Sequence, residues 1–129
     1  MLSERYSRQE LLADIGKEGQ NVLRNKTVAI IGIGALGTVS SELLARAGIG
    51  NLILIDRDII EESNLQRQTL FTEGDIGKSK ATVAKKRLTK INSTLNILPN
   101  PIHLNPKNIL VLEKLDFVLD CTDNLSSRF

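Results

Sequence analysis

The stretch "VAIIGIGALGT", residues 28–38, constrains the fold of this chain more than any other feature. It joins an apolar run to Gly32, Gly34 and Gly37, which have the spacing G-x-G-x-x-G. Between a strand and a helix, such glycines allow a tight turn, a close approach of the backbone to a phosphate, and close helix–strand packing. The pattern predicts a nucleotide-binding α/β unit. A tight turn without a ligand is the alternative, because glycines also punctuate ordinary turns.

The rest of the chain alternates between apolar runs of strand length and segments with helical spacing of apolar residues. Strands are predicted at 27–34, at 52–56, within 95–104 and at 116–120. Helices are predicted from Leu36 to Ala47, at 79–92 and at 106–114. The first has helical spacing of Leu36, Val39, Leu43, Leu44 and Ala47, and one face of the second carries Ala81, Ala84, Leu88 and Ile91. This alternation indicates a parallel sheet with right-handed crossovers. Residues 5–24 are predicted to form one or two further amphipathic helices, which a minimal unit of this kind lacks.

The predicted fold is therefore a Rossmann-like, doubly wound α/β fold with a mainly parallel sheet. We divide it into an N-terminal helical extension at 1–26 and a nucleotide-binding domain at 27–129. The last predicted strand is followed by the start of a helix, and the sequence stops at Phe129. We expect the domain to be incomplete at its C-terminus, because a final strand without a covering helix exposes apolar surface.

Composition excludes several classes of function. With 129 residues, of which 41% are hydrophobic and 25% charged, the chain suits one globular domain. A net charge of +2 and 3% aromatic residues argue against a nucleic-acid partner. No apolar run is long enough to span a membrane, and the first residues are too polar for a signal peptide. Cys121, the single cysteine, cannot form a disulfide framework, so a cytoplasmic location is expected.

Polar residues follow the second predicted strand. Asp56 ends that strand, where an acidic residue meets a ribose hydroxyl in dinucleotide folds, although a solvated strand end or a turn cap is the alternative. A long polar segment then carries Asn64, Gln66, Arg67 and Gln68. The guanidinium of Arg67 is a planar fork that suits phosphate oxygens, and Asn64 adds an amide.

Two lysines stand near the start of the helix predicted at 79–92. Lys78 and Lys80 add positive charge where a helix N-terminus already favours anions. NAD offers only a pyrophosphate bridge, so these additional cations indicate a triphosphate or a leaving pyrophosphate. The other basic residues of this helix are interpreted as a solvated face.

The motif "DCTDN" at 120–124 closes the last predicted strand with Asp120 and Asp123. Doubly wound sheets bind ligands at the carboxyl ends of their strands. A carboxylate there, facing a triphosphate, suits Mg²⁺, although both aspartates could instead cap the following turn. Cys121 is interpreted as a small buried strand residue, and His103 is assigned no role.

Five segments together resemble the ThiF/MoeB/HesA family, which is related to the ubiquitin-activating enzymes. They are "RYSRQ" (5–9), "GIGALG" (32–37), "AGIGNLILIDRDIIEESNLQRQ" (47–68), "IGKSK" (76–80) and "DCTDN" (120–124). Members of this family adenylate the C-terminal glycine of a small ubiquitin-like protein, using ATP and Mg²⁺. In the bacterial branch this carrier then takes up sulfur for molybdopterin or thiamin synthesis.

The resemblance implies a role for each matching residue. ATP would be bound by Gly32, Gly34, Ala35, Gly37, Asp56, Asn64, Gln66, Arg67, Lys80, Asp123 and Asn124. Among these, Asp56 would hold the ribose and Asp123 the Mg²⁺. The residues implied to act in catalysis are Arg8, Arg67, Lys80 and Asp123. Ala35 stands where many members have glycine, and we expect its methyl group to be tolerated.

The resemblance also implies partners. The carrier would end in Gly-Gly, and a homodimer would bring Arg8 into the neighbouring subunit's site. Zinc bound by CxxC pairs is expected only in a part of the protein beyond Phe129. Three alternatives stay open: an NAD-dependent oxidoreductase, a non-catalytic scaffold or carrier-binding subunit, and a family branch that activates a non-protein carboxylate such as a modified tRNA base.

Overall fold

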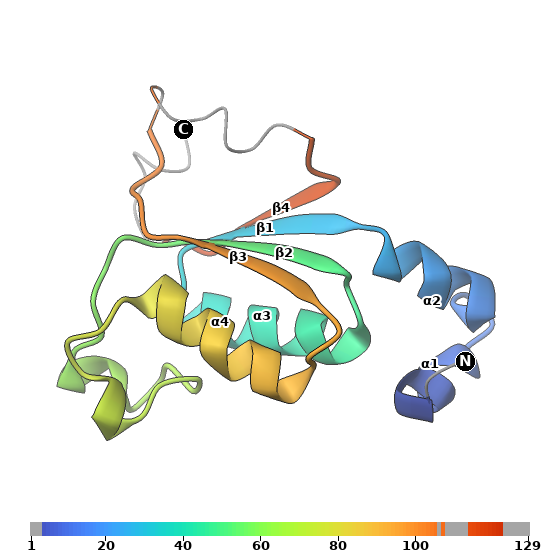
Figure 1. Cartoon of the computed structure of the whole chain (residues 1–129), viewed down its shortest axis with the longest axis horizontal. Coiled ribbons are helices and arrows are strands. Elements are labelled where there is room, and N and C mark those ends of the chain that lie inside the picture. The colour runs from blue at the N-terminus through green and yellow to red at the C-terminus, as the bar shows by residue number, and fades with distance from the viewer. Residues whose placement is uncertain (1–3, 106, 108–113, 123–129) are drawn as a thin grey trace.

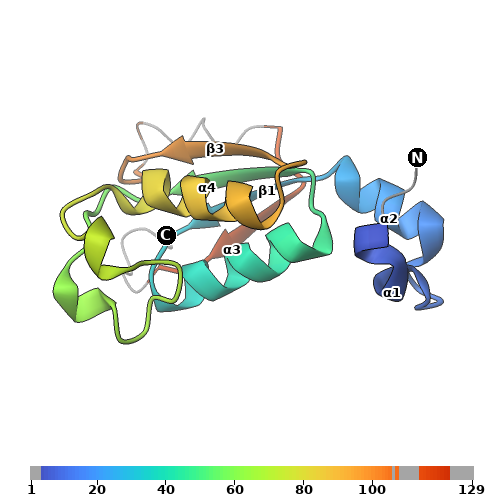
Figure 2. The ribbon, with the colours of Figure 1, turned by 60° about the horizontal axis from the view of Figure 1, so that its bottom comes forward.

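A computed structural model of the chain describes residues 4–105, 107 and 114–122. Four parallel strands form one sheet in the order β3-β2-β1-β4 (Figure 1). They are β1 (Thr27–Ile31), β2 (Asn51–Ile55), β3 (Asn96–Asn100) and β4 (Phe117–Asp120). Helices α3 (Ala35–Ala47) and α4 (Lys80–Ile91) cover the same face of the sheet (Figure 2). This arrangement confirms the predicted Rossmann-like α/β fold.

The strands match their predictions closely, apart from the end of the first. The strand predicted at 27–34 ends at Ile31, because Gly32 has a φ of +91° and leaves the extended conformation. The weak strand expected within 95–104 is β3. The helix predicted at 106–114 falls largely outside the described residues. In the described part of the chain, no helix is long and apolar enough to cross a bilayer.

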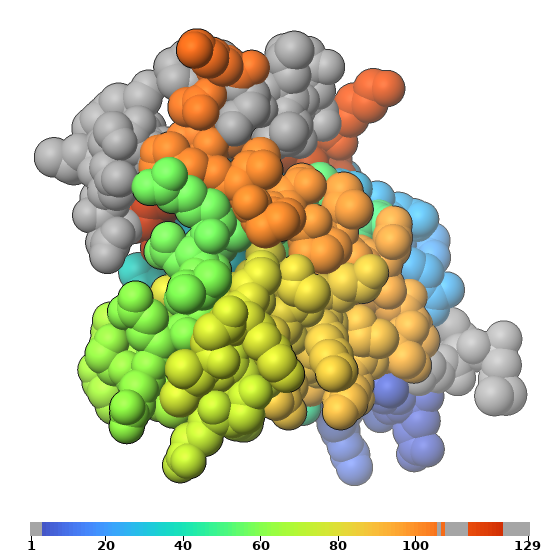
Figure 3. Space-filling view, turned by 60° about the vertical axis from the view of Figure 1, so that its left-hand side comes forward, coloured from blue at the N-terminus to red at the C-terminus, as the bar shows by residue number. Residues whose placement is uncertain are grey.

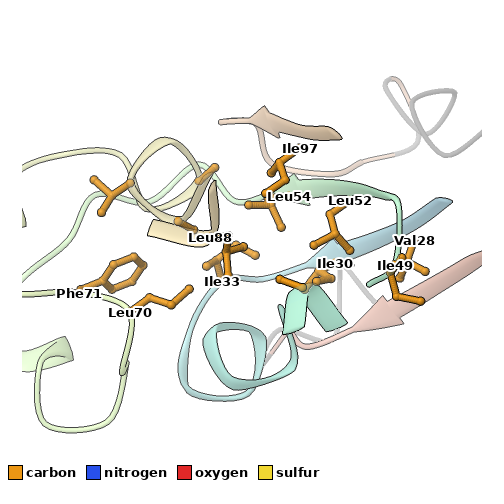
Figure 4. Close-up of a cluster of buried hydrophobic side chains, with 14 of the residues drawn as sticks. Val28, Ile30, Ile33, Ile49, Leu52, Leu54, Leu70, Phe71, Leu88 and Ile97 are labelled. Atoms are coloured by element: carbon orange, nitrogen blue, oxygen red, sulfur yellow. The ribbon is translucent and has the colours of Figure 1, made fainter. Parts of the chain in front are cut away.

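The main core lies between the sheet and its two helices. Ile30, Leu52 and Leu54 point from the strands into this core, to which Leu88 of α4 also belongs (Figure 4). Leu88 is fully buried together with Ala81 and Ala84, as the helical spacing of these residues predicted. On the opposite face of the sheet, Ile31, Ile55 and Leu104 form a smaller apolar cluster.

Helix α3 presents a different face to the sheet from the one that Leu36 and Leu43 suggest, although Leu44 packs against the core. Its buried residues are small ones, among them Thr38, Ser41 and Ala45. Leu36 and Leu43, which share the helical spacing, are 65% and 61% exposed. Because only three residues separate α3 from the end of β1 and the helix packs closely on the strand, small side chains fit the gap, and Leu36 and Leu43 are directed outward.

The N-terminal extension is an arm that packs on the domain at the amino ends of the strands. It comprises η1 (Glu4–Tyr6), α1 (Ser7–Glu10) and α2 (Gly16–Arg24). The side-chain amides of Gln9 and Gln20 both donate to the carbonyl oxygen of Ala47, at 2.8 and 2.9 Å. The fully buried Asn92 donates to the hydroxyl of Tyr6 at 2.7 Å. These buried hydrogen bonds hold the arm on its own domain.

Candidate functional site

A cavity of about 660 Å³ lies at the carboxyl ends of the strands. Its wall comes from the ends of β1 and β2, the residues that follow β3 and β4, the start of α3, and parts of the segment 56–80. Figure 3 brings this end of the molecule forward, with residues 57–71 in green and the segment after β3 in orange. In the sheet, β1 has β2 on one side and β4 on the other, so the strand order reverses direction at β1. Ligands of such sheets usually bind at this topological switch point.

The three glycines of the loop have separate functions. A Cβ at Gly32 would stand 2.9 Å from the carbonyl oxygen of Cys121, and one at Gly37 would stand 1.8 Å from that of Gly32. These two glycines therefore serve the packing of the loop on α3 and β4. A Cβ at Gly34 would meet only the amide nitrogen of Gln68, at an ordinary 3.5 Å. Gly34 lines the cavity, so its missing side chain leaves room there rather than inside the protein.

The start of α3 adds backbone hydrogen-bond donors to the edge of the cavity next to Gly34. No side chain caps the helix at Gly34. The first N–H groups of a helix have no acceptor within it and carry the positive end of the helix dipole. Ala35 and Leu36, the first residues of α3, line the cavity. This edge of the cavity therefore suits an anion.

Asp56 braces the glycine loop as well as lining the cavity. One carboxylate oxygen accepts the N–H of Ile33 at 2.7 Å, and the other accepts that of Asp58 at 2.8 Å. The aspartate therefore does cap the turn, which was the alternative to ribose binding. Each oxygen of a carboxylate has a second lone pair, so both functions are compatible.

Residues 58–80 form a loop that is closed at its base. The N–H of Ile60 donates to Lys78 and that of Gly77 donates to Ile60, both at 2.8 Å. The N–H of Lys80 donates to Asp58 at 3.0 Å. Between these ends, Leu70 and Phe71 reach into the main core (Figure 4). The closed base and the buried anchors fix the position of the polar residues in the loop.

An ion pair fastens the far side of this loop to α4. Arg87 donates to the buried carboxylate of Asp75 at 2.9 Å. Burial raises the pKa of Asp75, but the N–H of Thr72 and the guanidinium of Arg87 together outweigh it. The pKa of this carboxyl group therefore lies below its ordinary value.

Three predicted phosphate-binding residues meet at the cavity. Lys80 is only 6% exposed, and in the described part of the chain no carboxylate pairs with its ammonium. Asn64 is buried and accepts the N–H of Glu61 through Oδ1, which leaves its NH₂ group to donate. Arg67 is exposed and uses one nitrogen on the carbonyl of Ser63, keeping its other N–H groups. This set of donors fits a ligand with several anionic oxygens.

The remaining wall of the cavity is partly apolar. Ile31, Ile55, Ile102 and Leu104 all line it, and they belong to the small cluster on the outer face of the sheet. An apolar wall next to a set of donors suits a ligand with a flat base and a phosphate chain. The residues present therefore fit a nucleotide.

Other predicted residues are not brought to the cavity. Gln66 is exposed, and neither it nor Gly37 lines the wall. Arg8 lies on α1, at the end of the molecule opposite the carboxyl ends of the strands (Figure 1). Asp123 and Asn124 fall outside the described residues. Within the described ranges no group of three potential metal ligands occurs.

Several lining residues were assigned no ligand role from the sequence. Arg57, Gln68, His103 and Thr122 line the cavity. Arg57, His103 and Thr122 could have been found from the sequence, because each lies within three residues of the end of a predicted strand. Cys121 also lines it, and burial raises the pKa of its thiol. Cys121 follows β4 and is half-buried, so the interpretation as a buried strand residue holds only in that its side chain packs against the main core.

Comparison with known proteins finds relatives over nearly the whole of this chain. The model of the ThiF family matches residues 6–129. The chain is 45% identical over 125 residues to the sulfur carrier protein ThiS adenylyltransferase of Escherichia coli K12, covering 96% of this chain and 50% of that protein. It is 44% identical over 126 residues to the adenylyltransferase and sulfurtransferase MOCS3 of Xenopus laevis, covering 97% and 28%. The chain thus spans half or less of the length of these relatives.

Solved structures agree with this placement. E. coli MccB with ATP superposes with a TM-score of 0.85 at 35% identity, over 95% of this chain and 38% of that one. E. coli tRNA N6-threonylcarbamoyladenosine dehydratase superposes with a TM-score of 0.90 at 26% identity, over 97% of this chain and 52% of that one. The first of these structures contains ATP.

Proposed function

Because the chain belongs to the ThiF family, we propose that its protein is an adenylyltransferase that uses ATP to activate the C-terminal glycine of a ubiquitin-like sulfur carrier. The observation that carries the proposal is Lys80, a lysine that is only 6% exposed, has no carboxylate partner in the described part of the chain, and lines the same cavity as Gly34. A largely desolvated cation without a partner is costly, and an anionic ligand would compensate it. Carriers of the molybdopterin and thiamin type are the proposed substrates, since relatives carry those activities in their names.

The reaction needs no nucleophile from the protein. A carboxylate oxygen of the carrier attacks the α-phosphorus of ATP, and the bond to the bridging oxygen of the β-phosphate breaks. Pyrophosphate leaves with that electron pair, and an acyl adenylate is formed without any proton transfer. The protein has to align the two reactants and neutralise the charge that develops on the phosphates.

The residues of the cavity divide these tasks. The start of α3 and Gly34 would contact the phosphates next to the ribose, and the free lone pairs of Asp56 would accept from a ribose hydroxyl. Asn64, Arg67 and Lys80 would hold the departing pyrophosphate. Mg²⁺, when bound, would neutralise phosphate oxygens, and Asp123 is the proposed ligand.

A homodimer is part of the proposal. Arg8 lies on α1, which Figure 1 shows at the end of the molecule away from the carboxyl ends of the strands, and it does not line the cavity of its own chain. Near it, Leu11 and Leu12 are 76% and 58% exposed, and on α3 an exposed apolar stripe begins with Leu36 at the cavity. A two-fold dimer that joins these surfaces would bring Arg8 of the partner subunit to the phosphates, as an arginine finger.

Pyrophosphate exchange tests the proposed function. The protein should exchange labelled pyrophosphate into ATP only when a carrier ending in Gly-Gly is present. Exchange with a peptide or a modified tRNA, but with no carrier, would identify another carboxylate substrate. Binding of a carrier without any exchange would identify a scaffold, and tight binding of NADH without exchange would identify an oxidoreductase.

A further inference from the structure

Gln68 is a buried residue of the cavity wall whose chemistry the roles above do not use. Its side chain is 3% exposed, and it lines the cavity. Its backbone N–H donates to the carbonyl of Asn64 at 2.9 Å, so the two residues are one helical turn apart. Both side chains are buried, whereas Gln66 between them is exposed. The turn therefore directs Asn64 and Gln68 inward.

The amide of Gln68 does not contribute to the stability of the fold. In the described part of the chain, its buried Oε1 has no hydrogen-bond partner. A buried polar atom without a partner is destabilising, and an apolar side chain of the same shape would fill this volume without that cost. Gln20, by contrast, is a buried glutamine whose amide accepts from Gln9 and donates to Ala47. The side-chain nitrogen of Gln68 also has no protein partner among the described residues, so the fold uses neither end of this amide, and Nε2 is free to donate to a ligand.

The position of the amide indicates which ligand atoms it meets. Its nitrogen lies 3.5 Å from the point where a Cβ on Gly34 would stand, at the uncapped start of α3. Lys80 and Asn64 line the same cavity and supply further donors. We propose that Gln68 is a further nucleotide-binding residue, whose Nε2 donates to a phosphate oxygen of ATP seated at Gly34. This inference rests on the proposed function, since it requires that ATP occupies the cavity.

The test compares the affinities of the wild-type protein and Gln68→Leu for ATP and for adenosine, which has no phosphate. A hydrogen bond to a charged group corresponds to roughly a 10- to 100-fold change in affinity. We expect Gln68→Leu to bind ATP weaker by that factor and adenosine unchanged. Gln68→Glu, which has nearly the same shape but carries a negative charge, should bind ATP more weakly still.

Thermal unfolding without ligand supplies the second readout. Gln68→Leu should melt at the same or a higher temperature than the wild type, because it removes an unpaired buried oxygen. Gln20→Leu is the matched control and should melt at a lower temperature. Equal ATP affinity of Gln68→Leu and the wild type, or a melting temperature lowered as much as in Gln20→Leu, would overturn the inference. Failure of the wild type itself to bind ATP would overturn the proposed function instead, and the inference with it.

Discussion

Alanine substitutions at Gly34 and Gly37 should separate ligand binding from folding within one loop. At Gly37 a methyl group would stand 1.8 Å from the carbonyl oxygen of Gly32, whereas real contacts of this kind are not shorter than 3.0 Å. The start of α3 would have to move by the difference, about 1.2 Å, against backbone that cannot rotate away. Overpacking of this kind costs about 3 kcal/mol, and the higher helix propensity of alanine offsets about 1 kcal/mol of this loss. We expect Gly37→Ala to lose about 2 kcal/mol or more of unfolding free energy.

The same methyl group at Gly34 meets only the amide of Gln68, at 3.5 Å. Alanine is a poorer N-cap residue than glycine, so Gly34→Ala should lose no more than about 1 kcal/mol. It places a methyl group in the cavity, however, and should weaken ATP binding by about tenfold or more, the factor that corresponds to 1.4 kcal/mol.

Urea unfolding measures the first quantity and calorimetric titration with ATP the second, on the same preparations of both variants. A Gly37→Ala protein as stable as the wild type would refute the packing argument. A Gly34→Ala protein with unchanged ATP affinity would show that the phosphates do not lie on this loop.

Three further perturbations probe charge and assembly. Lys80→Met should lower the rate of pyrophosphate exchange by about 10²-fold or more without loss of unfolding free energy. Arg67→Ala should have a similar effect on the rate. Full activity of both variants would contradict the proposed roles of the two residues. The pKa of Asp75 is lowered from 3.8, so its contribution to stability is present above that pH and is lost as the pH falls through the lowered pKa. Urea unfolding should therefore show Asp75→Asn to be less stable than the wild type at pH 7, with the difference narrowing toward pH 2; a constant difference would argue against this ion pair. Arg8→Ala and Asp123→Ala proteins, each nearly inactive, should recover exchange activity when mixed, and recovery should fail despite subunit exchange if Arg8 serves its own subunit.

The sequence predicts the order of elements well because each strand and helix has a local pattern. The apolar runs give the strands, and Ala81, Ala84 and Leu88 identify the inner face of α4. Helix α3 is the exception, since Leu36 and Leu43 share helical spacing but face outward, and only Leu44 packs against the core. Which face of α3 is buried depends on how closely the helix approaches the sheet, and no local pattern contains that distance.

The candidate site was predicted by residue type but not always by position. Lys80 and Asn64 line the cavity as expected, whereas Gln66 points outward and Gln68 inward. These two glutamines have the same chemistry, and only the turn that follows Asn64 distinguishes them. The ion pair between Arg87 and Asp75 was also beyond sequence reasoning, because it joins a loop to a helix surface interpreted as solvated.

The closed base of the loop at residues 58–80 has a consequence for the speed of binding. A loop that becomes ordered around its ligand loses chain entropy at that moment, and association then waits for the loop to close. Here the ladder between Ile60 and Lys78 and the anchor at Phe71 bring about that ordering when the chain folds. The loop therefore loses its conformational entropy on folding rather than on binding. The side chains proposed to bind ATP are already positioned when the nucleotide arrives. Nucleotide association should accordingly be limited by diffusion into the cavity, and differences in affinity among variants of Asn64 or Arg67 should arise in the rate of release.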